Sequence, residues 1–277
     1  MPNEGRPTIK SAEEITPNAK YIRVPALLKA TEEQGFSGPD LAITDDFMNG
    51  LVKGVVLHQR VAYDDVHRNR YHNAEHAEEV VARTRGLVRR IKGLDANDQK
   101  LMIIAAALHD LGHSGATVRL APDGLSNEAY TATLADQILT AYKFSVRQRV
   151  QMYGLIMGTT FGSPAIKPET KMEKVLSMAD VGGFTKRWVH WVEESSYVLH
   201  ETPVAERPAT VEEWLHGRLK FLAWIESRLN ELPEVAKYWH PYLEEKKMRI
   251  NYLLQIPAGP SMKSIRTFIV PLLKKSA

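Results

Sequence analysis

Two histidines stand four residues apart in the motif YHNAEHA at residues 71–77. On a helix, His72 and His76 would project from the same face, and this spacing would let two imidazoles serve one site. Taken alone, the motif is explained more simply by two exposed histidines on a charged helix. Whether these histidines form a functional site therefore depends on the other polar residues that the fold brings next to them.

A second motif, LHDLGH at residues 108–113, ends the most apolar helix that the sequence predicts. An imidazole and a carboxylate at the end of a buried helix are costly unless they are paired or bind a metal ion. Adjacent His109 and Asp110 can both reach one cation beside the helix end, and His113 follows one turn later. A metal site explains this motif better than a helix end stabilised by His113.

Two further acidic residues fit the same site. Asp180 ends an apolar helical segment, and Glu128 stands in the first turn of a predicted helix, where a carboxylate also suits the helix dipole. Imidazole and carboxylate donors together suit zinc, manganese, iron or magnesium. The chain has 10 histidines and no cysteine, which excludes disulfides, cysteine-ligated metal sites and cysteine nucleophiles.

The elements that must position these residues are predicted to be helices. Apolar residues recur at spacings of three and four from residue 40 onward, and sustained β alternation is absent, so the expected class is all-α. Residues 1–40 are expected to form an N-terminal arm, 41–260 the functional domain and 261–277 a C-terminal tail. The expected helical segments are 74–91, 98–111, one opening at 126, 146–159, 171–179, 186–199, 211–229 and 234–255.

Charge and hydropathy exclude other classes of partner. With 36 basic and 33 acidic residues, the net charge of +3 gives no basic surface for an extended nucleic acid. The longest apolar run, residues 101–108, is too short to span a bilayer, and residues 1–20 lack the apolar stretch of a signal peptide. A cytoplasmic protein is expected. Tryptophans at helical spacing in the C-terminal half suit core or interface positions, which leaves a homodimer open.

The order of these motifs resembles the HD superfamily of metal-dependent phosphohydrolases. Within it, residues 71–77 and 109–115 are similar to the catalytic domain of class I cyclic-nucleotide phosphodiesterases, and weaker likeness extends over about residues 45–255. The resemblance implies an all-α helical bundle that hydrolyses a phosphodiester. A nucleotide or a related small phosphodiester is the implied substrate.

The resemblance also implies two divalent metal ions and a role for each candidate residue. The four ligands of the first ion would be His76, His109, Asp110 and Asp180. Asp110 would bridge to the second ion, a hydroxide between the ions would be the nucleophile, and His72 would be the general acid for the leaving oxygen. The other implied site residues are His113 and Glu128, which orient water, and Tyr71, Thr159 and Phe221, which contact substrate.

One position departs from the family pattern. The glutamine that recognises the base in the family falls at Arg218 here. Arginine has no acceptor, so it cannot offer a purine the same switchable donor and acceptor. The resemblance therefore implies a cyclic nucleotide as the substrate but does not support specificity for adenine or guanine.

Three other functions compete with a phosphodiesterase. An HD-type nucleotidase would act on a phosphomonoester, and His72 counts against it because a dedicated acid suits an alkoxide leaving group. An HD-type di-iron oxygenase would place histidines between the His-Asp pair and the final aspartate, but residues 114–179 contain none. A non-catalytic nucleotide-binding sensor is the third alternative, although every expected ligand and the expected acid are present.

Overall fold

The computed structural model describes residues 39–64, 69–113, 126–161 and 166–255, together with residues 265, 267, 269 and 270. Every regular element in the described part is helical, which confirms the predicted all-α class. The loop at 114–125, almost all of the predicted arm and most of the predicted tail lie outside the described residues. The domain boundaries at 40 and 260 stay predictions.

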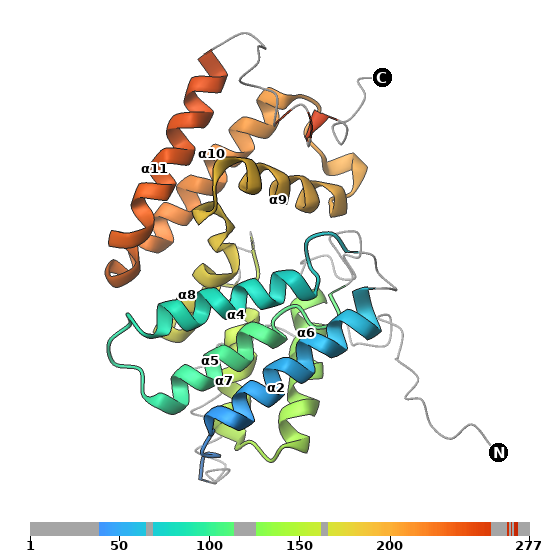
Figure 1. Ribbon diagram of the computed structural model, residues 1–277, viewed down its shortest axis with the longest axis vertical. Coiled ribbons are helices and arrows are strands. Elements are labelled where there is room, and N and C mark those ends of the chain that lie inside the picture. The colour runs from blue at the N-terminus through green and yellow to red at the C-terminus, as the bar shows by residue number, and fades with distance from the viewer. Residues whose placement is uncertain are drawn as a thin grey trace, which may run out of the picture.

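Six helices form one bundle, in the lower half of Figure 1. They are α2 (Asp45–His58), α4 (Ala74–Val88), α5 (Ala96–Leu108), α6 (Ser126–Ala141), α7 (Val146–Met157) and α8 (Lys171–Asp180). Helix α5 packs against α2, α4, α7 and α8, and every side chain from Leu101 to Leu108 is buried. A helix that is apolar all round needs neighbours on every side, so its sequence places it at the centre of the bundle.

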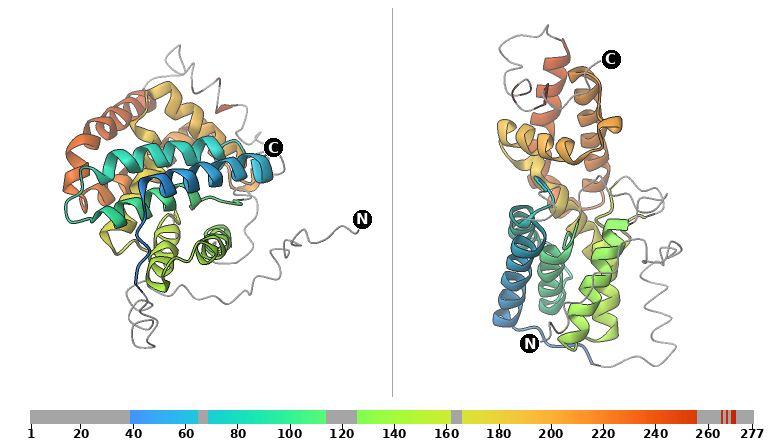
Figure 2. Two further views of the ribbon diagram at one scale, coloured as in Figure 1. Left: turned by 60° about the horizontal axis from the view of Figure 1, so that its bottom comes forward. Right: turned by 90° about the vertical axis from the view of Figure 1, so that its right-hand side faces the viewer.

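Three further helices lie above this bundle, as Figure 1 and the side view in Figure 2 show. They are α9 (Trp188–Glu201), α10 (Val211–Leu229) and α11 (Pro233–Gln255). A short 3-10 helix, η3 (Val181–Thr185), continues directly from α8 and packs against both α9 and α11. The end of α8 therefore lies where the two groups of helices meet.

Local sequence signals set the ends of the elements that carry the motifs. The side chain of Asn73 accepts a hydrogen bond from the backbone N–H of His76, so α4 begins at Ala74. The expectation that His72 and His76 share a helix face is wrong, because His72 precedes this cap. At the end of α5, Gly112 adopts φ +77°, a left-handed conformation that turns the chain directly after the His-Asp pair.

Candidate metal centre

Four of the predicted ligands converge on one point. His76 comes from the first turn of α4, His109 and Asp110 follow α5, and Asp180 ends α8. One ligand atom from each lies within 4.8 Å of the others. Because α4, α5 and α8 pack against one another, the bundle itself brings these residues together from distant parts of the sequence.

The spacing of the donor atoms suits a common ion. His76 Nε2 lies 3.0 Å from Asp180 Oδ1, and His109 Nε2 lies 3.0 Å from Asp110 Oδ2. The Nε2 atoms of the two histidines are 3.4 Å apart. Donors held about 2.1 Å from one ion are separated by about 3.0–3.4 Å at octahedral or tetrahedral angles. The four side chains therefore have the spacing of a ligand shell.

Hydrogen bonding around the cluster also fits a metal ion. His109 Nδ1 donates to the carbonyl of Ala106 at 2.9 Å, so Nε2 is the ring nitrogen that faces the other ligands. Asp110 Oδ2 is buried and has no hydrogen-bond partner among the described residues, although His109 Nε2 lies close to it. A buried carboxylate oxygen is costly in this state, and a bound cation would satisfy it.

The protonation states of the four residues in the cluster favour the binding of a cation. Burial raises the pKa of Asp110, but the neighbouring His109 lowers it further, so the pKa lies well below its ordinary value. The pKa of Asp180 is also lowered, because hydrogen bonds from His109 and His76 outweigh its burial. Burial lowers the pKa of His76, which favours the neutral imidazole that binds metals. Burial lowers the pKa of His109, but the charge of Asp110 raises it well above its ordinary value. A divalent ion would take the place of the proton on His109 and would meet two ionised carboxylates.

The backbone at Asp180 is held by hydrogen bonds from an arginine side chain. The Arg83 guanidinium donates to the carbonyl of Ala179 at 2.6 Å and to that of Asp180 at 3.3 Å. The Arg83 side chain passes so close to Gly182 that a Cβ there would lie 2.7 Å from Arg83 Cδ. Glycine at 182 therefore lets Arg83 reach the end of α8 and hold the ligand in place.

Metal binding should be visible as stabilisation. Adding Mn²⁺ or Zn²⁺ to metal-free protein is expected to raise its melting temperature, because an ion that binds only the folded state stabilises it. At a free metal concentration of about 100 Kd, the free energy of unfolding should rise by about 2.7 kcal/mol. Differential scanning fluorimetry with and without a chelator measures the shift. The same shift in an Asp110→Asn variant would contradict this site.

A histidine–glutamate pair lies beside the metal cluster. His72 Nδ1 donates to Glu201 Oε2 at 2.5 Å, and the His72 ring centroid is 6.1 Å from that of His76. Burial opposes protonation of His72, but the hydrogen bond to Glu201, with the charge of Asp110, raises its pKa to about 9. At neutral pH the imidazole is therefore protonated and oriented.

Glu201 is a site residue that the sequence did not reveal. Its Oε1 also accepts hydrogen bonds from the backbone N–H groups of Tyr71 at 2.5 Å and His72 at 3.3 Å, so one carboxylate fixes both the imidazole and its backbone. The one feature of the sequence that could have pointed to Glu201 is its position at the end of a predicted helix. A carboxylate in the last turn of a helix faces the negative end of the dipole, which is unfavourable without a compensating partner.

The two residues predicted to orient water also lie near the cluster. The His113 ring stacks on that of His72, with centroids 3.9 Å apart and an angle of 17° between the planes. Burial and the charge of His72 lower the pKa of His113 to about 3, so it stays neutral. Burial, with the negative charge of Asp110, raises the pKa of Glu128 to about 7.

The predicted substrate contacts divide into two groups. Tyr71 lies against the centre, with its ring centroid 4.4 Å from that of His76, and it shares a small cavity with Phe221. The Phe221 ring also packs against Phe161 and Trp224. The hydroxyl of Thr159 instead donates to the carbonyl of Ile156, and no hydrogen bond joins it to the cluster within the described part of the chain.

Comparisons of the chain with protein-family models, curated proteins and solved structures found no match. Among the described residues, the structure contains no helix with the length and apolar character needed to cross a bilayer. The function therefore has to be inferred from the geometry of the site.

Proposed function

We propose that the protein is a metal-dependent phosphohydrolase that cleaves a phosphodiester, with a nucleotide as substrate. The observation that carries this proposal is the cluster of His76, His109, Asp110 and Asp180, whose donor atoms lie within 4.8 Å of one another. The protonated His72 beside it supports hydrolysis in particular, because a metal centre alone would also serve binding or redox chemistry. The likeness of the two histidine motifs to the HD superfamily agrees with this assignment.

The four-residue cluster would hold one divalent ion, and the Asp110 carboxylate would be shared with a second. Bound there, divalent ions supply hydroxide at neutral pH and neutralise negative charge on the phosphate oxygens. Asp110 lies between the two histidine ligands, 3.0 Å and 3.4 Å from their Nε2 atoms. Asp180 has the same two distances, so the assignment of Asp110 to both ions rests on the likeness of its motif to the HD superfamily.

His72 is the proton donor in this proposal. Glu201 accepts from Nδ1, which leaves Nε2 as the nitrogen that can give a proton to the leaving oxygen. The ring of His113 stacks on the imidazole of His72 and covers one of its faces. A protonated and oriented imidazole at neutral pH is what an alkoxide leaving group requires.

Hydrolysis of a substrate panel tests the proposed function. Protein loaded with Mn²⁺, Zn²⁺ or Mg²⁺ is assayed against 3′,5′- and 2′,3′-cyclic nucleotides, dinucleotides and bis(p-nitrophenyl) phosphate, with p-nitrophenyl phosphate as the monoester. We expect metal-dependent turnover of diesters. Faster turnover of monoesters would identify a nucleotidase instead. Nucleotide binding without turnover of any ester would identify a sensor.

The pH dependence of the reaction should report on His72. Its pKa of about 9 means that the acid form is present below pH 9 and is lost as pH rises through that value. We therefore expect kcat/KM to fall tenfold per pH unit above about pH 9. Glu201→Gln removes the carboxylate that raises this pKa, so the descending limb should move to lower pH, toward the ordinary histidine value of about 6.5.

Glu193→Gln is the matched control, because Glu193 stands on the same helix but accepts its hydrogen bond from Tyr197. Its pH profile should match that of the unchanged protein. An unchanged descending limb in Glu201→Gln would show that His72 does not set the alkaline side of the profile.

A further inference from the structure

Arg218 on α10 carries a guanidinium group with no anionic partner among the described residues. Its Nε atom is buried without a hydrogen bond, and no ion pair or hydrogen bond of its other nitrogens is found in the part of the chain that the structure describes. The guanidinium carbon lies 5.3 Å from the ring centroid of Phe221 and 6.0 Å from that of Trp214. The charge is therefore held against aromatic rings.

The Arg218 side chain is half-buried, and its buried Nε atom lacks the hydrogen bond that such an atom normally has. Burial lowers the pKa of Arg218 to about 10, so the group is still protonated at neutral pH. Contact with aromatic faces offsets only part of the cost of removing a cation from water. Arginine also presents five donors in a planar fork, and that fork matches the oxygens of a carboxylate or a phosphate.

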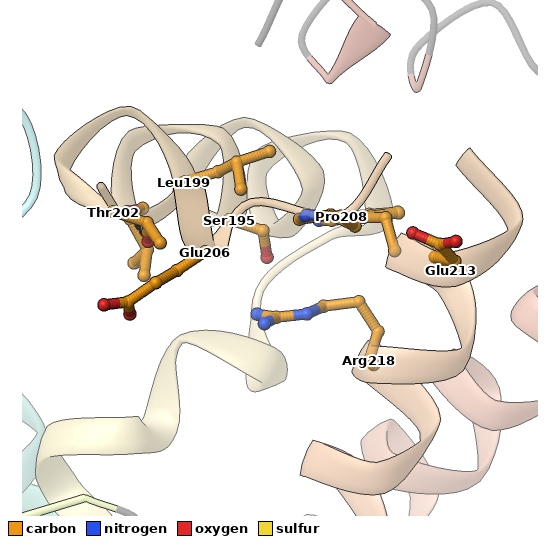
Figure 3. A pocket seen from close by; sticks show the side chains of 10 residues that line it. Ser195, Leu199, Thr202, Glu206, Pro208, Glu213 and Arg218 are labelled. Atoms are coloured by element: carbon orange, nitrogen blue, oxygen red, sulfur yellow. Dashed lines mark hydrogen bonds between the residues drawn. The ribbon is translucent and has the colours of Figure 1, made fainter. Parts of the chain in front are cut away.

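Two cavities meet at Arg218. The larger, of about 260 Å³, lies between α9 and α10, and Figure 3 shows the guanidinium extending across it beneath Ser195. The smaller, of about 50 Å³, is also lined by Arg218 and reaches Tyr71 and Phe221. The Tyr71 ring that lines this smaller cavity packs 4.4 Å from that of His76, so a single aromatic side chain separates the cavity from a candidate metal ligand.

The acidic residues that line the larger cavity do not neutralise Arg218. Glu213 accepts a hydrogen bond from the backbone N–H of Ala209 at 2.7 Å. Figure 3 shows the carboxylates of Glu206 and Glu213 on opposite sides of the guanidinium and turned away from it. The guanidinium of Arg218 therefore remains available in this cavity to pair with a negatively charged ligand.

We propose that Arg218 binds a second oxyanion of the substrate, a phosphate or a carboxylate, while the phosphodiester lies at the metal centre. The assignment of this oxyanion to the substrate rests on the proposed function. It narrows the substrate class to phosphodiesters that carry another negative group, such as dinucleotides or nucleotides with an additional phosphate. A simple cyclic mononucleotide lacks that group and is a poorer fit.

Binding of inorganic phosphate to metal-free, full-length protein tests the oxyanion site without any turnover. Isothermal titration calorimetry of the Arg218→Gln variant should show phosphate binding weakened roughly tenfold or more, as expected for the loss of a charge-assisted hydrogen bond. Arg218→Lys keeps the charge but loses the fork, so its affinity should be intermediate. A parallel titration with acetate tells whether a carboxylate competes with phosphate for the site.

Arg228→Gln is the matched control, because Arg228 also stands on α10 and stacks on an aromatic ring, that of Trp224 at 5.4 Å. It should leave phosphate binding unchanged. Equal phosphate affinity in Arg218→Gln and the unchanged protein, or an equal loss in Arg228→Gln, would overturn the oxyanion site. Absence of any phosphate or acetate binding to the unchanged protein would overturn it as well.

A pair of substrates connects the site to catalysis. Thymidine 5′-(p-nitrophenyl phosphate) and its 3′-phosphorylated form differ only in the second anionic group. We expect the unchanged protein to prefer the phosphorylated form in kcat/KM by roughly tenfold, and Arg218→Gln to lose that preference. The same preference in Arg218→Gln would overturn this inference alone. Failure to hydrolyse either diester would count against the proposed function, whereas the phosphate titration would still decide the oxyanion site.

Discussion

Asp110→Asn is expected to abolish both metal binding and phosphodiester hydrolysis. The variant keeps the shape of the side chain but removes the negative charge that lies between His76 and His109. Because metal ions contribute several kcal/mol to charge stabilisation in the transition state, their loss should lower kcat/KM by at least about a thousandfold. Metal content after dialysis, measured by plasma emission spectrometry, and initial rates on the best diester check this result.

Asp136→Asn serves as the control for Asp110→Asn. Asp136 is an exposed aspartate that pairs with Arg149 at 2.8 Å, and it is not among the predicted site residues. It should retain full metal content and full activity. Normal metal content and rates in Asp110→Asn would refute the assignment of this carboxylate as a metal ligand.

His72→Asn is expected to lower the rate while leaving the bound metal in place. Loss of a positioned general acid typically costs about 10²- to 10⁴-fold in rate. The loss should be large for substrates with an alkoxide leaving group, such as a sugar oxygen. It should be small for p-nitrophenyl diesters, because p-nitrophenolate leaves without needing a proton.

The ratio of these two losses separates a general acid from a residue that only supports the fold. An equal loss with both leaving groups would indicate a structural role for His72. His200→Asn is the control variant, because His200 is an exposed histidine on α9 next to Glu201. It should change neither rate.

Patterning along the sequence predicted the helices well where one apolar stripe faces the core. Residues 211–229 were predicted as a helix, and α10 has those bounds. The helix expected at 186–199 instead runs from Trp188 to Glu201. Its start is delayed because η3 continues from α8 through Thr185, and this continuation depends on packing against α9 and α11 rather than on local propensity. The π-helix at Gln59–Asp64 also lacked a local signal.

The candidate metal ligands were predictable because their types and positions are costly without a partner. His109 and Asp110 end a helix whose sequence already requires complete burial, so their polarity stands out. Glu201 did not stand out, because its partner His72 is 129 residues away in the sequence. The missing counterion of Arg218 was equally hidden, since only the packing of α9 and α10 shows which charges fail to meet.

The complete burial of α5 has a consequence for how the site can move. Amide hydrogens in such a helix exchange with solvent only when the whole domain unfolds, whereas helices with fewer buried contacts exchange through smaller openings. His109 and Asp110 follow α5 directly. Glu201 and Arg218 stand on α9 and α10, outside this bundle. The candidate site therefore combines residues next to the central helix of the bundle with residues from a second group of helices, and amide exchange measured in α5, α9 and α10 would show whether the two groups open together.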